Sequence, residues 1–126
     1  MDKYTKFYEN ADRDNIYSSG VELDNDRFTN ILLLIKKKYC NNNAKVLEIG
    51  AGNGRFQDIF DDYTAVDITE NSKKYFHKPY IVIKDKEPYP FENDTFDLIF
   101  TNAVFEHIPD IDTALKEMKR VLKVGG

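Results

Sequence analysis

The sequence lacks several features that would each indicate a particular class of protein. It has a single cysteine, Cys40, which excludes an internal disulfide framework and a metal cluster built from cysteines alone. Its longest aliphatic run, residues 31–35, is far shorter than the roughly 20 residues that cross a bilayer. The first residues lack the apolar core and the cleavage site of a secretory signal. We therefore expect a cytoplasmic protein without a membrane partner.

An excess of positive charge is also missing. The chain has 18 Lys and Arg residues against 22 Asp and Glu residues, which gives a formal net charge of -4. No general positive field therefore favours nucleic acid, which we do not expect as a partner. The acidic residues show no convincing metal-binding arrangement, and we expect no metal.

What the sequence does contain is typical of one globular domain. Hydrophobic residues make up 41% of the chain and aromatic residues 13%, which is enough for a packed core. A length of 126 residues suits one domain and is too short for two ordinary ones. We predict an N-terminal arm over residues 1–20, which are polar with scattered aromatic residues, and a folded core over residues 21–126.

Four short apolar runs are typical of buried parallel strands. They cover residues 45–49, 63–68, 80–83 and 96–100. Between the first three runs lie two segments, 53–60 and 70–76, that have room for helices. This alternation predicts an α/β fold in which crossover helices connect the strands of a parallel sheet.

Two amphipathic helices are predicted from apolar residues at helical spacing. The first contains residues 28–39, with Asp24 or Asp26 as its candidate N-cap. The second contains residues 111–122, with Asp110 as its candidate N-cap. Each helix has an apolar face that can pack against the sheet.

A glycine-rich loop follows the first predicted strand, where Gly50, Gly52 and Gly54 alternate with other residues. Glycines there let the backbone turn with positive φ and let a ligand approach closely. A dinucleotide-binding fingerprint needs its third glycine one position later, where this chain has Arg55. A triphosphate-binding loop would need a following Gly-Lys-Ser/Thr, which is absent. The loop therefore disfavours pyrophosphate and triphosphate ligands, and an ordinary tight turn is the alternative.

Acidic residues lie at the same predicted edge of the sheet. Asp67 ends the second strand, where a carboxylate can accept hydrogen bonds from both hydroxyls of a ribose. Asp85 follows the third strand and can accept from the exocyclic amine of a purine, and Glu48 can accept from an ammonium group. Singly, each acid could be a solvated carboxylate at a strand end. Together with the glycine loop they predict a site for a nucleoside that has a cationic tail and no phosphates.

These motifs resemble the class I S-adenosylmethionine-dependent methyltransferases, especially their small-molecule branch. The similarity runs from about Lys45 to Gly126 and is carried by segments 47–54, 90–99, 105–108 and 115–126. One departure is Val124, where the family often has proline. The resemblance implies a Rossmann-like, doubly wound parallel sheet in the order 3-2-1-4, truncated to about four strands with flanking helices and lacking the usual C-terminal strands.

The resemblance also implies S-adenosylmethionine as the cofactor. The glycine loop would hold its methionine moiety, Asp67 the ribose, and Asp85 with the Lys86 backbone the adenine. Asn102 and Ala103 would lie near the sulfonium. The cofactor-binding residues implied in this way are Glu48, Gly50, Ala51, Gly52, Gly54, Asp67, Ile68, Asp85, Lys86, Asn102 and Ala103.

The sequence assigns no catalytic residue. His107 is a candidate on the acceptor side, where a base is needed only if the acceptor must lose a proton, and a packing or capping role is the alternative. His77 lies beside Lys78 and Pro79 and is expected in a surface turn.

The predicted function is therefore methyl transfer from S-adenosylmethionine to an unknown, small-molecule acceptor. One alternative is a cofactor-binding or interaction module without catalysis, because the C-terminal half of the resembled fold is absent. A nicotinamide-dependent dehydrogenase is a further alternative, against which the position of the third glycine argues. The fourth strand would have an unpaired edge, which makes a homodimer through this edge possible.

Overall fold

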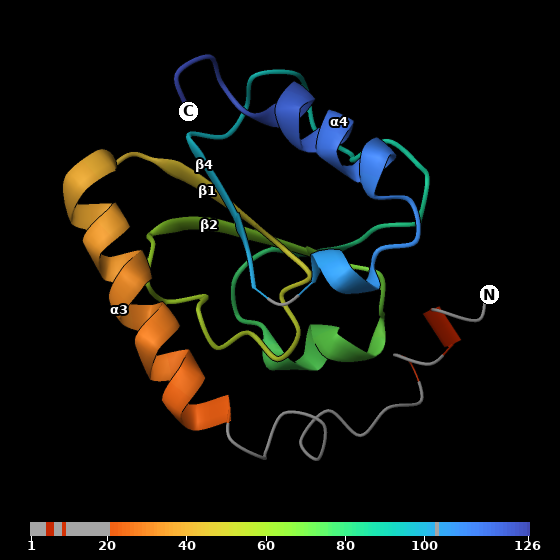
Figure 1. Cartoon of the computed structure of the whole chain (residues 1–126), viewed down its shortest axis with the longest axis horizontal. Helices are drawn as coiled ribbons and strands as arrows, with labels where there is room; N and C mark the ends of the chain where they lie inside the picture. The colour runs from red at the N-terminus through yellow and green to blue at the C-terminus, as the bar shows by residue number, and fades with distance from the viewer. Residues whose placement is uncertain (1–4, 7–8, 10–20, 103) are drawn as a thin grey trace.

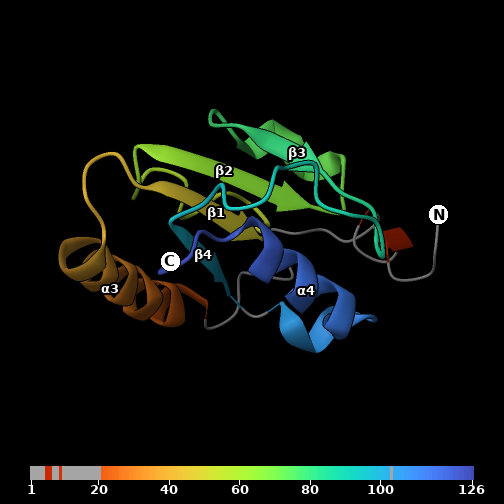
Figure 2. The same cartoon turned by 90° about the horizontal axis from the view of Figure 1, so that it is seen from above.

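The computed structural model describes residues 5–6, 9, 21–102 and 104–126. Four parallel strands form one sheet in the order β3-β2-β1-β4 (Figures 1 and 2). The strands are β1 (Lys45–Ile49), β2 (Asp62–Asp67), β3 (Tyr80–Val82) and β4 (Leu98–Thr101). The predicted α/β fold and the predicted strand order are confirmed.

Strand β1 occupies the interior of the sheet. Its residue Val46 lies opposite Tyr63 of β2 and Leu98 of β4. All residues of β1 after Lys45 are buried, without the alternation of a half-exposed strand. Such a continuous apolar run is typical of a strand that is covered on both faces.

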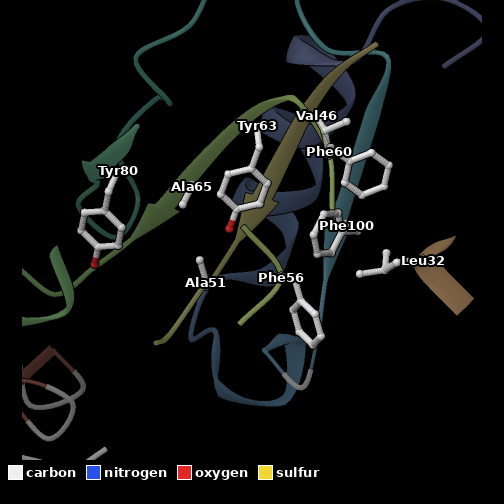
Figure 3. Close-up of a cluster of buried hydrophobic side chains, with 9 residues drawn as sticks. All are labelled: Leu32, Val46, Ala51, Phe56, Phe60, Tyr63, Ala65, Tyr80 and Phe100. Atoms are coloured by element: carbon white, nitrogen blue, oxygen red, sulfur yellow. The ribbon is translucent and has the colours of Figure 1, made fainter. Parts of the chain in front are cut away.

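Among the described residues, one α-helix covers each face of the sheet (Figure 1). The helix α3 (Val21–Tyr39) packs Leu32 against a cluster that contains Val46 and Phe100, as Figure 3 shows. The helix α4 (Ile111–Val121) packs Val121 against Leu47, which points to the opposite face. Burying each such large apolar side chain contributes about 1.5–3 kcal/mol to folding.

Of the two predicted helix N-caps, one is confirmed and one is wrong. Asp110 is the N-cap of α4, since its Oδ1 atom accepts a hydrogen bond from the Thr113 backbone N–H at 3.1 Å. The prediction for α3 is wrong, because this helix begins at Val21, upstream of both Asp24 and Asp26.

Segment 53–60 forms hydrogen-bonded turns, so the prediction of a helix there is wrong. The backbone bonds join residues three apart, such as the Gln57 N–H to the Gly54 carbonyl and the Ile59 N–H to the Phe56 carbonyl. An α-helix needs bonds between residues four apart. The shorter helix predicted over 70–76 is present as the 3₁₀ helix η1 (Asn71–Tyr75).

The outer side of β4 has no strand partner among the described residues. On this side only the residues just before β4 are paired, because Phe96 forms an isolated β-bridge with Leu122, which follows α4. This agrees with the unpaired edge expected from the sequence. Within the described part of the chain, no helix combines the length and apolar character that crossing a bilayer requires.

The arm predicted over residues 1–20 lies largely outside the described residues. Thr5, Lys6 and Glu9 are described and are helical. Glu9 accepts a hydrogen bond from the Glu70 backbone N–H at 2.7 Å, which ties this segment to the chain just after β2.

Candidate functional site

The glycine loop turns at the carboxyl ends of β1 and β2. Gly50, Gly52 and Gly54 have φ values of 71°, 59° and 79°, in the left-handed region that favours glycine. The Gly50 N–H donates to the Val66 carbonyl at 2.8 Å, which fastens the start of the loop to β2. The positive φ values predicted from the sequence are therefore confirmed.

Asp67 is the buried carboxylate beside this loop, with a relative exposure of 8%. Its Oδ2 atom accepts from the Gly52 N–H at 3.0 Å, and its Oδ1 atom accepts from the Ile68 N–H at 2.7 Å. The backbone thus fixes the orientation of the Asp67 carboxylate at the carboxyl ends of β1 and β2.

A pocket with a cavity volume of about 70 Å³ opens between this edge of the sheet and α4. The predicted residues that line it are Gly50, Asp67, Ile68, Asp85 and Lys86. Apolar walls are supplied by Ile83, Val104 and Ile108, none of which the sequence analysis singled out. Apolar walls with a few placed polar groups are typical of small-molecule sites.

The turn after β3 presents Asp85 and Lys86 to the pocket. The Glu87 N–H donates to the Lys84 carbonyl at 3.3 Å, and Lys86 adopts a positive φ of 65° at the centre of the turn. Asp85 is half-buried there, and Lys86 is exposed. The two residues predicted to bind an adenine therefore share one turn at the pocket.

Residues of α4 help to form a further wall of the pocket, which was not predicted from the sequence. Glu117 lines the pocket and accepts from the Tyr89 N–H at 2.7 Å. Arg120 donates to Glu117 at 2.8 Å and to the Tyr89 and Phe91 carbonyls at 3.0 and 2.8 Å. Hydrogen bonds from Arg120 lower the pKa of Glu117, and burial raises the pKa of Tyr89 to about 12. Only the (i, i+3) spacing of Glu117 and Arg120 was visible in the sequence.

Glu48 does not line the pocket. Its side chain is 2% exposed, on the same face of the sheet as Val46, and accepts a hydrogen bond from the Tyr63 hydroxyl at 2.5 Å. Burial raises the pKa of Glu48 to about 8, with a smaller contribution from Asp67 that the Tyr63 bond opposes. Its predicted role as an acceptor for an ammonium group stays a prediction.

Residues 47–126 match the sequence profile of the methyltransferase-domain family, which covers more than half of the chain. The chain belongs to this family of methyltransferase domains. A relative from Methanocaldococcus jannaschii, an uncharacterized protein, is 33% identical over the whole chain. The chain spans 57% of the length of that relative.

Solved structures agree with the methyltransferase fold. The chain is similar over its full length to a Methanococcus maripaludis protein assigned to the S-adenosyl-L-methionine-dependent methyltransferases, with a TM-score of 0.73, 21% identity and 63% of that chain covered. It is also similar to phosphoethanolamine N-methyltransferase 2 of Haemonchus contortus in complex with phosphomonomethylethanolamine and S-adenosylhomocysteine. That match has a TM-score of 0.63 and 27% identity, and covers 77% of this chain and 26% of the other. These neighbours imply S-adenosylmethionine as the cofactor of the family.

The remaining predicted residues of the methyltransferase domain lie near the end of β4. Asn102 is half-buried and does not line the pocket, and Ala103 lies outside the described residues. Val104 packs closely on the glycine loop, since its Cγ2 atom would be 2.4 Å from a Cβ atom built on Gly50. The Thr101 hydroxyl is buried without a hydrogen-bond partner among the described residues, and Thr101 does not line the pocket.

Neither histidine lines the pocket of the methyltransferase domain. His107 is exposed in the 3₁₀ helix η2 (Phe105–His107), and its acceptor-side role stays a prediction. His77 is exposed, with its Nε2 atom 2.5 Å from Asp58 Oδ1. The surface position expected for His77 is confirmed.

Proposed function

We propose that this chain binds S-adenosylmethionine in the pocket beside α4 and serves methyl transfer to a small-molecule acceptor. The observation that carries the proposal is Asp67, a buried carboxylate held by two backbone N–H groups at the wall of that pocket. Asp85 lines the same pocket from the next strand along the sheet. This is the acidic pattern that a nucleoside requires at the carboxyl edge of parallel strands.

The residues present fit this cofactor by their chemistry. Asp67 would accept from the ribose hydroxyls, and Asp85 with the Lys86 backbone would meet the polar edge of the adenine. Ile68 and Ile83 would contact the faces of the ring, because both line the pocket. The loop of Gly50 to Gly54, with Ala51, would hold the methionine moiety. Bound there, S-adenosylmethionine supplies a methyl group on a positively charged sulfur, which is already an activated leaving group.

The residues of the chain would then act by holding and aligning the reactants. An in-line displacement depends chiefly on proximity and orientation, which preorganised groups provide. The Gly52 N–H and the Ile68 N–H preorganise Asp67 before any ligand arrives. Val104 would shield the loop from water, since it packs on Gly50. His107 remains the candidate for a base, if the acceptor must lose a proton.

The ligand bound to one structural neighbour supports a small-molecule acceptor. The Haemonchus contortus enzyme is seen with phosphomonomethylethanolamine, a small molecule. The acidic balance of this chain also disfavours a nucleic-acid acceptor. The activity of the whole protein is part of the proposal, because the chain covers 57% of its relative's length. We also propose, from the sequence, that the protein is cytoplasmic.

A titration with S-adenosylhomocysteine by calorimetry tests the proposal. We expect saturable binding by the unchanged chain and at least about tenfold weaker binding by Asp67→Asn, because the amide loses a charged acceptor worth about 1.5–3 kcal/mol per bond. The matched control is Asp61→Asn, which changes an exposed acid just before β2 and should bind normally. Absence of binding by the unchanged chain would refute the proposal.

A second assay distinguishes an enzyme from a binding module without catalysis. Transfer of a labelled methyl group to candidate acceptors, phosphoethanolamine first among them, would show an enzyme. Saturable binding without transfer to any acceptor would favour the module. The pocket is formed by this chain's own described residues, so binding is expected in either case.

A further inference from the structure

Arg120 does not line the pocket, but its hydrogen-bond partners Glu117 and Tyr89 do. A guanidinium has five N–H bonds, and each of those on Arg120 has an acceptor. Nε and one terminal nitrogen donate to the two carboxylate oxygens of Glu117, both at 2.8 Å. The other three N–H bonds donate to the Tyr89 carbonyl, the Phe91 carbonyl and the Asn93 side-chain oxygen, at 3.0, 2.8 and 3.0 Å. The guanidinium therefore holds all of these groups in one rigid arrangement.

Segment 84–93 follows β3, contains the turn predicted to bind the adenine, and depends on these bonds for its position. Within residues 86–90, Tyr89 is buried, with a relative exposure of 7%, and the others are exposed. Among the described residues, every hydrogen bond between segment 84–93 and α4 involves Glu117 or Arg120. These two side chains therefore hold the adenine turn in place relative to α4, which forms the facing wall of the pocket.

We propose that Arg120, acting through Glu117, sets the preference of the pocket for adenine over other purine bases. This rests on the proposed function, in which Asp85 accepts a hydrogen bond from the exocyclic amine of the adenine. Asp85 can distinguish bases only while it is held at hydrogen-bond distance from that amine, because a displaced carboxylate accepts from water instead. Arg120 contacts no part of the ligand in this arrangement, so it is a positioning residue.

The arrangement requires a guanidinium and not merely a positive charge. A lysine has a single nitrogen, which cannot reach both oxygens of Glu117 and three further acceptors at once. The Glu117 side chain is 14% exposed and the Arg120 side chain 29%, so water competes little for their bonds. Without the guanidinium, the carbonyls of Tyr89 and Phe91 lose their link to α4, and segment 84–93 is free to shift.

Arg120→Lys tests the proposal, with affinities measured by calorimetry for S-adenosylhomocysteine and S-inosylhomocysteine. The second ligand has an oxygen in place of the exocyclic amine of the base. We expect the unchanged chain to prefer S-adenosylhomocysteine by at least about tenfold. Arg120→Lys should bind S-adenosylhomocysteine about five- to tenfold more weakly and S-inosylhomocysteine within about twofold of the unchanged chain, so that most of the preference is lost. A purely structural loss would weaken both ligands equally and keep their ratio.

Lys119→Arg is the matched control, because it exchanges one cation for the other at the neighbouring, exposed position of α4. It should leave both affinities unchanged. Thermal unfolding shows whether Arg120→Lys is folded at the temperature of the titration. If it is not, Glu117→Gln replaces it, because the amide has one accepting oxygen in place of two and should lower the preference about threefold.

A double-variant cycle relates the effect to the acid that contacts the base. Asp85→Ala should remove most of the preference, and adding Arg120→Lys should then cost little more, because both changes remove the same interaction. Additive losses, or a preference that persists in the folded variant, would overturn the inference and leave the proposed function standing. Equal affinity of the unchanged chain for the two ligands would also overturn the inference. If the unchanged chain binds neither ligand, the proposed function itself fails.

Discussion

At the scale of single residues, Gly50 shows most clearly why the loop needs glycine. Its φ of 71° lies in the left-handed region, and an added Cβ atom would be 2.4 and 2.8 Å from the two methyl carbons of Val104. Gly125 also has a positive φ, of 85°, but an added Cβ atom there would meet nothing within 4 Å. The two glycines therefore share the backbone requirement and differ in the space around them.

We predict that Gly50→Ala destabilises the domain more than Gly125→Ala does. Left-handed backbone alone should cost each variant about 1 kcal/mol, and the clash with Val104 should add about 1–3 kcal/mol for Gly50→Ala. Urea unfolding measures the difference in the free energy of unfolding. The double variant Gly50→Ala with Val104→Ala should recover most of the additional loss. Equal destabilisation by the two single variants would contradict the contact between Val104 and the loop.

At the scale of elements, local sequence patterns predicted the structure correctly where one physical cause determined it. The strand β1 has the predicted bounds, Lys45–Ile49, because a short apolar run that ends at a glycine leaves few alternatives. Asp110 caps α4 as predicted, because its spacing to the helix start is a local property. The pocket residues Gly50, Asp67 and Asp85 are also brought together as the parallel strands require.

Tertiary contacts decided the elements that were predicted wrongly or missed. In segment 53–60, the Gln57 amide donates to the Gly54 carbonyl and to the Tyr75 carbonyl, which holds tight turns where a helix was expected. The wall of the pocket depends on Arg120, which binds carbonyls about 30 residues away in the sequence. Glu48 is placed away from the pocket for a similar reason, since its partner Tyr63 comes from β2. No periodicity in the sequence indicates such pairs.

At the scale of the whole molecule, the open edge of β4 adjoins apolar surface on both helices. A hollow of about 540 Å³ at this edge is lined by Phe28 and Ile35 of α3 and by Met118 of α4. Ile31, which is 45% exposed, lies between Phe28 and Ile35 at helical spacing. Unpaired strand edges without protecting charges or prolines favour association. The homodimer expected from the sequence thus stays a prediction, with a defined surface.

We predict that the chain associates with itself through this surface at micromolar concentration. Ile31→Glu should shift the protein towards the monomer, because a charge would be buried in the contact. Leu33→Glu is the control, because Leu33 is similarly exposed, at 47%, but lies on another side of α3. Light scattering after size-exclusion chromatography measures the molar mass. A strictly monomeric chain at every concentration would contradict the prediction.

The location of the ligand is the central claim, and one measurement tests it most directly. A ¹⁵N-correlation spectrum of the chain, titrated with S-adenosylhomocysteine, reports binding at each backbone amide. The largest shifts are expected at Gly52 and Ile68, whose N–H groups hold Asp67, and at Lys86 and Val104 around the pocket. Shifts confined to α3 and β4, or no saturable shifts at all, would contradict the assignment of this pocket to the cofactor.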